Sequence, residues 1–340
     1  MRKLIVLGLL AGLGPAVRKP ELPRLRRAVT LAALAGALAI LIGVPQATAT
    51  TRGPNGLIAY AQELRPGKFQ LFTIRPDGSG KKQITRVQSS NPDWSPDGRR
   101  LVFDVEHAHG PAFCSVELAN ADGSGVRDLT GKRNGCEYQP AFMPNGRRIV
   151  FVHHDVKTKV ESIWSMNLRG GDRRPITPRR RGAGVTDPNV SPDGKWITYV
   201  RLKRTYKLQA LFAVRPNGSR LHRLTPYSWE VAVKHDWSPD GKLIVLTTNA
   251  DFVRPHESAN LVTIRPDGSG MTQLTHFTGA KENAFAGSFS PDGTQIVFRL
   301  EDHGQYGLYR IRPDGGALHA VLPLSSAKAR FIDWGPRPTP

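Results

Sequence analysis

The amino-acid sequence predicts an all-β fold, a six-bladed β-propeller whose last strand completes the first blade. The prediction rests on a motif that repeats along the chain, two tight-turn signals in every repeat, and an incomplete copy at each end of the series. After residue 50 no run has the spacing of a long amphipathic helix. We therefore expect the propeller to fill residues 50–340.

The repeated motif is Trp94-Ser95-Pro96-Asp97-Gly98, followed by the short apolar run Leu101-Val102-Phe103. Relatives of this motif recur along the chain, and their prolines are Pro54, Pro96, Pro144, Pro192, Pro239, Pro291 and Pro336. The spacing between these prolines is 42 to 52 residues. A period of that length is typical of propellers and solenoids.

Two turns divide each repeat into four short strands, which we name A to D in chain order. Pro-Asp-Gly between two apolar runs forms a tight hairpin, because proline fixes φ and the residues after it tolerate positive φ. A second turn, such as Arg75-Pro76-Asp77-Gly78, joins runs such as Leu71–Ile74 and Gln83–Thr85. Four strands in a unit of this length make a propeller blade.

Counting the units gives six blades. Sets of strands B, C and D begin near residues 56, 99, 147, 195, 242 and 294. The first set has no strand A before it, whereas Arg330–Trp334 is a strand A without its own strand B. A ring in which this last strand completes the first blade leaves no free sheet edge.

Residues 1–49 have the composition of a leader. Basic residues precede an apolar run over residues 28–44, and Ala47-Thr48-Ala49 follows as a small-residue cleavage site. These are the three parts of a secretory signal peptide, so we expect export to the periplasm or the extracellular space. The alternative is a membrane tether over residues 28–44, because this run is at the short end of a spanning length.

The net charge is +20, of which +6 lies in residues 1–49 and +14 in the remainder. A strongly basic exported protein is attracted to anionic surfaces, such as a membrane or an acidic polysaccharide, unless its charges are evenly scattered. The chain has no zinc-finger, RNP or helix-turn-helix signature, so nucleic acid is not an expected partner. We expect the propeller to be monomeric.

Cys114 and Cys136 are the two cysteines of the chain. In an exported protein an even pair is more often a disulfide than two free thiols. Cys114 falls in strand C of the second blade and Cys136 in the connection to strand A of the third, so neighbouring blades can bring them together.

The repeat also predicts which face binds. The A–B and C–D turns are short and share one face, whereas the longer, irregular B–C and D–A connections share the other, which we call the long-loop face. Binding residues concentrate on irregular loops held by a rigid scaffold. In the third and fourth blades this face carries a basic and aromatic group that suits an anionic ligand or an acidic partner: Arg179, Arg180, Arg181, Arg201, Lys203, Arg204, Lys207, Tyr227 and Trp229. A solvated basic rim is the alternative.

Histidines and a carboxylate on the B–C loops are candidate ligands for a divalent metal ion. They are His107, His153, His154, Asp251, His256 and His303. No two blades repeat a ligand pattern. The alternative to a metal site is that these are ordinary polar residues at a solvated rim. We expect no cofactor, with a divalent metal at these residues as the alternative.

Strand A is the innermost strand of each blade. The residues expected nearest the axis are amide and charged groups that can line a water-filled channel: Asn91, Gln139, Asp187, Lys234 and Arg330. Large aromatic residues recur with the period of the repeat, which is a packing demand between blades and not a ligand cage. They are Trp94, Phe142, Trp237, Phe289 and Trp334.

The Trp-Ser-Pro-Asp-Gly units resemble the propeller repeats of the TolB family, as do the Leu-Thr ends of strand D at Leu129-Thr130, Leu224-Thr225 and Leu274-Thr275. The resemblance covers residues 55–336 and implies a six-bladed, exported, TolB-like propeller that acts by protein–protein contact. TolB itself carries a small α/β domain before its propeller, whereas here the leader runs into the first blade. The partners of TolB are therefore not carried over.

We expect an exported, non-catalytic binding scaffold that docks an envelope protein or an anionic envelope polymer through its long-loop face. The chain has no Gly-x-Ser-x-Gly elbow and no His-Glu-x-x-His motif. The alternative is a metal-dependent enzyme acting on acidic carbohydrate, because some propellers with this repeat resemble oligogalacturonate lyases, which use metal-bound histidines.

Overall fold

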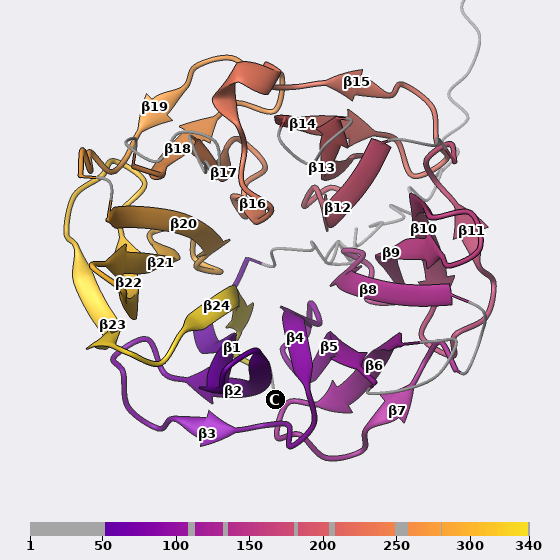
Figure 1. The fold of residues 1–340 in the computed structure, drawn as a ribbon, viewed down its shortest axis with the longest axis horizontal. Coiled ribbons are helices and arrows are strands. Elements are labelled where there is room, and N and C mark those ends of the chain that lie inside the picture. Colours follow the sequence, from indigo (N-terminus) through magenta and orange to yellow (C-terminus); the bar gives the residue numbers. More distant parts are fainter. Residues whose placement is uncertain are drawn as a thin grey trace, which may run out of the picture. The chain divides into compact units, whose positions relative to one another are not determined.

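The computed structural model describes residues 52–107, 113–131, 135–179, 183–203, 208–248, 258–279 and 281–338. Six four-stranded antiparallel sheets stand around a common axis, as Figure 1 shows, so the predicted six-bladed propeller is confirmed. No helix in these ranges has the length and hydrophobicity needed to cross a membrane. The expected leader lies outside the described residues.

The first three blades follow the predicted order of strands. Blade 1 consists of β24 (Ala329–Pro336), β1 (Asn55–Arg65), β2 (Lys68–Ile74) and β3 (Lys82–Gln83). Blade 2 consists of β4 (Ser89–Trp94), β5 (Arg100–Glu106), β6 (Cys114–Asn120) and β7 (Arg127–Asp128). Blade 3 consists of β8 (Gly135–Phe142), β9 (Arg148–Asp155), β10 (Val160–Asn167) and β11 (Arg174–Pro175).

The last three blades repeat the pattern. Blade 4 consists of β12 (Ala183–Val190), β13 (Ile197–Lys203), β14 (Leu208–Val214) and β15 (His222–Arg223). Blade 5 consists of β16 (His235–Trp237), β17 (Ile244–Thr248), β18 (Asn260–Ile264) and β19 (Thr272–Gln273). Blade 6 consists of β20 (Glu282–Phe289), β21 (Ile296–Asp302), β22 (Gln305–Ile311) and β23 (His319–Ser325). A short 3₁₀-helix, η1 (Tyr227–Trp229), lies between blades 4 and 5.

The ring is closed by the C-terminal strand. β24 pairs antiparallel with β1, placing Asn55 opposite Pro336 and Ile58 opposite Trp334. In Figure 1 the yellow β24 therefore lies beside the indigo β1 in one sheet. This confirms the predicted completion of blade 1.

The Pro-Asp-Gly turns are held by their own side chains. In the turn between β4 and β5, the Gly98 N–H donates to the Ser95 carbonyl at 2.8 Å. The Asp97 carboxylate accepts from the Ser95 hydroxyl at 2.5 Å and from the Arg99 N–H at 3.1 Å. Gly98 has a φ of 66°, which a residue with a side chain adopts only at a cost. These turns satisfy their own polar groups, so they are rigid and compact.

The Leu-Thr ends of strand D have a structural reason. The Leu71 N–H donates to the Thr85 hydroxyl at 2.8 Å. Equivalent bonds join Val116 to Thr130, Ile163 to Thr177, Leu211 to Thr225 and Leu261 to Thr275. The threonine hydroxyl thus bonds strand C just beyond the two-residue backbone ladder of β3, β7, β11, β15 and β19.

The predicted aromatic set packs between blades. Trp94, Phe142, Trp237, Phe289 and Trp334 are at most 4% exposed. Trp94, for example, belongs to a cluster that combines Ala59 and Leu71 of blade 1 with Leu101 and Phe103 of blade 2. The interpretation of these residues as blade-to-blade core is confirmed.

Candidate functional site

Strand A carries a β-bulge near the axis in blades 2, 3 and 4. The register of β4, β8 and β12 shifts around Asn91, Gln139 and Asp187 respectively. These residues have φ values of 47°, 49° and 51°, a region that non-glycine residues rarely adopt. A bulge bends the strand and re-aims a side chain. The bulges thus set the direction of three residues that the sequence placed nearest the axis.

Three aspartates, each directly before a tryptophan of the repeat, tie neighbouring blades together. Each accepts a hydrogen bond from the backbone N–H of the aromatic residue in the next blade. The pairs are Asp333 with Trp94 at 2.7 Å, Asp93 with Phe142 at 2.7 Å, and Asp236 with Phe289 at 2.8 Å. In blade 4, Asn189 takes the equivalent place and donates to Asp236 at 3.1 Å.

The environment of these aspartates favours their neutral form. Burial raises the pKa of Asp236 to about 6, and the charge of Asp333 adds to the effect. Burial and the neighbouring Asp333 likewise raise the pKa of Asp93 well above its usual range. Burial also raises the pKa of Asp333, although Lys234 opposes the shift.

Lys234 supplies the positive charge among these carboxyl groups. Its Nζ lies 3.9 Å from Oδ1 of Asp187, and its side chain is 18% exposed. Burial disfavours its charge, but Asp187, Asp333, Asp93 and Asp236 outweigh burial and raise the pKa of Lys234. The ammonium group is therefore protonated at neutral pH.

A cavity of about 290 Å³ lies at the axis next to this cluster, and we call it the axial cavity. Among the described residues, its lining includes Gln139 from blade 3, Gln209 from blade 4, Lys234 directly before β16 of blade 5, Phe285 and Arg299 from blade 6, and Arg330 and Phe331 from blade 1. Phe285 precedes Phe289 in β20, and Arg330 precedes Trp334 in β24. The cavity therefore lies in the half of the axis nearer the D–A connections, towards the long-loop face.

Two arginines give the cavity its charge. Arg299 forms an ion pair with Glu301 at 2.9 Å, and its guanidinium lies 4.1 Å from the centre of the Phe285 ring. The guanidinium of Arg330 lies 4.2 Å from the centre of the Phe69 ring. Burial lowers the pKa of Arg299 to about 10, with Arg330 adding to the shift and Glu301 opposing it.

The structure brings together part of the basic and aromatic group expected on blades 3 and 4. Lys203 lies 5.6 Å from the centre of the Tyr227 ring. Arg201 lies 5.4 Å from the ring centre of Phe212, which itself contacts Tyr227. Tyr227 and Trp229, both in η1, pack against the hydrophobic core. Arg179 pairs with Asp155, and the remaining members lie outside the described residues: Arg180, Arg181, Arg204 and Lys207.

The described candidate metal ligands each have a partner of their own. The shortest contacts are His107 to Ser115 at 2.8 Å, His153 to Glu137 at 3.1 Å, His154 to Glu161 at 3.5 Å, and His303 to Asp302 at 2.5 Å. Asp251 and His256 lie outside the described residues. Across the described ranges, no three His, Cys, Asp or Glu side chains are grouped so that they could hold a metal ion.

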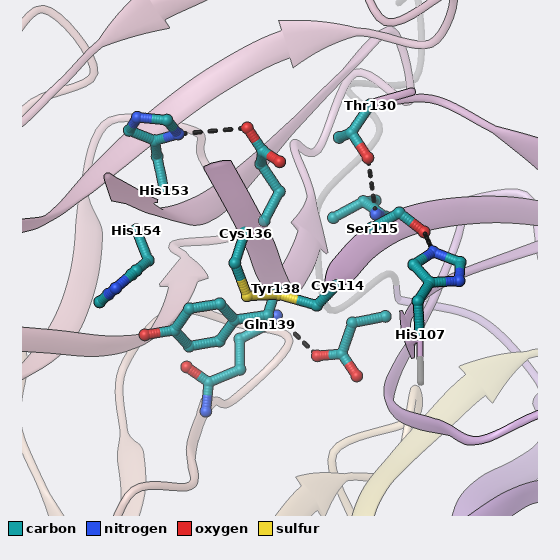
Figure 2. The surroundings of a disulfide bond; sticks show 12 residues. His107, Cys114, Ser115, Thr130, Cys136, Tyr138, Gln139, His153 and His154 are labelled. Atoms are coloured by element: carbon teal, nitrogen blue, oxygen red, sulfur yellow. Dashed lines mark hydrogen bonds and ion pairs between the residues drawn. A yellow bond between two sulfur atoms is a disulfide. The ribbon is translucent and has the colours of Figure 1, made fainter. Parts of the chain in front are cut away.

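A disulfide joins blades 2 and 3. It links Cys114, the first residue of β6, to Cys136, the second residue of β8, with Cα atoms 4.8 Å apart. Cys136 thus lies inside strand A and not in the connection before it. Figure 2 shows His107 on one side of the disulfide and His153 and His154 on the other, so the bond separates these histidines.

Sequence reasoning found Gln139, Lys234 and Arg330 at the axis but missed their neighbours. The three blade-linking aspartates had a signal in the sequence, because Asp93, Asp236 and Asp333 each stand directly before a tryptophan of the repeat. The sequence carried no signal for Arg299, because its position in β21 is occupied by other residue types in the equivalent strands of the other blades.

These features define a β-propeller with a small charged cavity at its axis. A family model described as the TolB beta propeller domain matches residues 55–338. The chain belongs to this family.

Two relatives show how much of the chain is shared. An uncharacterized protein of Agrobacterium fabrum is 27% identical over 239 residues, which cover 68% of this chain and 78% of that protein. A TolB homolog of Chlorobium luteolum is 30% identical over 221 residues, which cover 64% of this chain and 47% of the homolog. The chain thus spans about half the length of that homolog.

Solved structures show the same fold. TolB from Acinetobacter baumannii aligns with a TM-score of 0.66 at 19% identity, over 83% of this chain and 67% of that one. An oligogalacturonate lyase in complex with manganese aligns with a TM-score of 0.53 at 12% identity, over 81% and 76% respectively. At these identities the likeness concerns the fold alone.

Proposed function

We propose that this protein is an exported, non-catalytic binding scaffold that docks a protein partner on its long-loop face. The observation that carries the proposal is the axial cavity, whose lining combines Lys234, Arg299 and Arg330 with the apolar side chains of Phe285 and Phe331. A mostly apolar concavity with a few placed polar groups is typical of binding sites. Aromatic and arginine side chains are also enriched where binding energy concentrates.

The two faces of the propeller differ in a way that supports this choice. The A–B turns satisfy their own polar groups, as Ser95, Asp97 and Gly98 show. The connections on the long-loop face are not uniformly long as expected, because the B–C connections of blades 1 and 6 are two-residue turns, between Arg65 and Lys68 and between Asp302 and Gln305. Their lengths vary, however, up to the D–A connection between Arg223 and His235 that contains η1, and this face also holds the axial cavity. Membership of the TolB propeller family supports a protein-binding role for such a face.

Site-specific photo-crosslinking tests the proposal in cells that make the protein natively. A photoreactive residue would replace His303, which is 66% exposed in the B–C turn of blade 6. The matched control replaces Lys242, which is 80% exposed in the A–B turn of blade 5. We expect discrete crosslinked protein species from position 303 and none from position 242. Equal products at both positions, or products at 242 alone, would contradict docking on the long-loop face.

The purified protein also distinguishes the scaffold from a metal-dependent enzyme that acts on acidic carbohydrate. We expect the thermal unfolding midpoint to stay unchanged on addition of manganese or of a chelator, and polygalacturonate to remain uncleaved. A manganese-dependent rise in the midpoint that the chelator reverses, together with cleavage, would replace the scaffold by the enzyme.

A further inference from the structure

We propose that the axial cavity is a carboxylate-binding site. Arg330, Arg299 and Lys234 receive the carboxylate, and Phe285 and Phe331 contact an apolar group attached to it. The carboxylate has two natural sources, the free C-terminus of a docked protein or a small organic acid. This inference deepens the proposed function and rests on it for the first of these sources.

The charge of the lining selects an anion. Among the described residues that line the cavity, every charged one is a cation. Two of the three cations already have counter-charges outside the lining. Lys234 faces the carboxyl groups of Asp187, Asp333, Asp93 and Asp236, and Arg299 is paired with Glu301.

Arg330 is the cation without a counter-charge in contact. Within the described part of the chain its guanidinium makes no hydrogen bond and no ion pair, and its buried Nε lacks a partner. Glu63 and Glu301 favour its charge from a distance. The Glu63 carboxylate itself contacts Lys328 at 3.4 Å and the Gly67 N–H at 2.6 Å, and Glu301 is paired with Arg299. Arg330 is partly exposed, but its Nε is a buried donor without a partner, which is costly, and a bound acceptor would remove that cost.

The two guanidinium groups also repel each other. Arg330 contributes to lowering the pKa of Arg299, and the buried Nε of Arg299 likewise lacks a partner. An anion placed between them would favour both charged forms. The planar arginine fork matches a carboxylate in a two-bonded arrangement.

The remaining residues of the lining indicate the chemistry and the size of the group attached to the carboxylate. Phe285, Phe331 and Ile332 supply an apolar wall, which suits an aromatic or aliphatic group and not a sugar covered with hydroxyl groups. A volume of about 290 Å³ is at the small end for a ligand site, so one side chain or one small acid fills it.

Calorimetric titration of the purified protein with 3-phenylpropionate and its uncharged amide tests the site. We expect the acid to bind about tenfold more tightly than the amide, or better, because it makes charge-assisted hydrogen bonds that the amide lacks. Arg330→Gln should abolish this preference. Arg310→Gln is the matched control, because Arg310 in β22 also has a buried, unpartnered Nε but bonds Gln295 at 2.8 Å and does not line the cavity.

Two further variants keep the test decisive if Arg330→Gln fails to fold. Arg299→Gln removes the second guanidinium, and Arg330→Lys keeps the charge but loses the fork; both should weaken binding of the acid in protein that unfolds cooperatively. Equal binding of acid and amide, unchanged binding in the folded variants, or no binding of the acid to folded wild-type protein would each overturn the carboxylate site.

To identify the source of the carboxylate, we would measure binding of a peptide that ends in phenylalanine, as the free acid and as the C-terminal amide. Tighter binding of the free-acid peptide than of 3-phenylpropionate assigns the site to a protein C-terminus, and the reverse order assigns it to a small acid. Crosslinking at position 303 without acid binding would overturn this inference and leave the docking face intact. Acid binding without crosslinking would support the carboxylate site and contradict docking on the long-loop face.

Discussion

At the scale of single residues, Asp236 combines a structural role with an unfavourable charge. Its carboxylate accepts hydrogen bonds from the Phe289 N–H at 2.8 Å and the Ser288 hydroxyl at 2.9 Å, so it joins blades 5 and 6. Only 3% of the residue is exposed. Burial and the neighbouring Asp333 raise its pKa to about 6, so ionisation near neutral pH costs free energy.

Asp236→Asn should change how stability depends on pH. The pKa of Asp236 in the folded state, about 6, exceeds the ordinary aspartate value of 3.8. Wild-type protein therefore loses stability relative to the variant as pH rises from about 4 to above 6, by up to about 3 kcal/mol. Denaturant unfolding at pH 4, 5, 6 and 7 measures this difference. Asp333, Asp93 and Lys234 titrate in both proteins, so parallel pH profiles would show that Asp236 is not the group responsible.

The axial residues show how far residue-level prediction reaches. Gln139 and Arg330 followed from their positions in strand A, because the innermost strand of every blade must face the axis. Lys234 was expected in strand A as well, and it lies directly before β16. The hydrogen bond from the Trp94 N–H to Asp333 could not be predicted, because it joins residues far apart in the sequence and depends on how two blades are offset. Arg299 lies in a strand B, where no repeated feature indicates that its side chain reaches the cavity.

At the scale of strands, blades 2 and 3 are held by a covalent link in addition to their packing. The Cys114–Cys136 disulfide ties β6, the third strand of blade 2, to β8, the innermost strand of blade 3. Its cysteines are 22 residues apart in the sequence. A link of this span stabilises chiefly by restricting the unfolded chain.

Replacing both cysteines by serine should lower the free energy of unfolding by about 3 kcal/mol. Chemical denaturation of the wild-type protein with and without a reducing agent should show a loss of the same size. The Cys114→Ser, Cys136→Ser double variant is the control, because reduction has no bond to break in it. An unchanged free energy of unfolding of the wild-type protein in the presence of the reducing agent would contradict the prediction.

The four-stranded blades were predictable because turn residues mark the ends of strands. The length of strand D was not predictable in this way. The run Gln83–Thr85 was expected to be a strand, whereas β3 ends at Gln83. Beyond Gln83 the Ile84 N–H still donates to the Leu71 carbonyl at 2.8 Å, but the Leu71 N–H donates to the Thr85 hydroxyl, so a side-chain oxygen replaces a backbone acceptor there. A strand pattern alone does not distinguish these two ways of bonding the neighbouring strand.

At the scale of the whole propeller, closure brings the C-terminal segment against the first A–B turn. A Cβ atom on Gly98 would lie 2.3 Å from the Pro336 carbonyl oxygen. The Arg337 N–H also donates to the Pro54 carbonyl at 2.8 Å. The turn between β4 and β5 thus needs glycine both for its φ of 66° and for the space that β24 occupies.

Gly98→Ala should therefore destabilise the protein more than Gly67→Ala. Both glycines have positive φ, 66° and 74°, so both variants lose about 1–2 kcal/mol from backbone strain. A Cβ on Gly67 meets nothing within 4 Å, whereas a Cβ on Gly98 collides with Pro336 and adds about 1–3 kcal/mol. Thermal unfolding of the two variants makes the comparison. Equal losses would mean that β24 can move aside without cost.

The pairing of β1 with β24 also governs when the molecule is complete. β1 ends at Arg65 and its partner β24 begins only at Ala329, so one edge of β1 stays unpaired until a strand from far along the sequence docks on it. An exposed strand edge is a template for pairing with other chains, and contacts between distant parts of a sequence form slowly. Protection of this edge against aggregation thus comes from a strand distant in the sequence, and a chain clipped before Ala329 would keep that edge open.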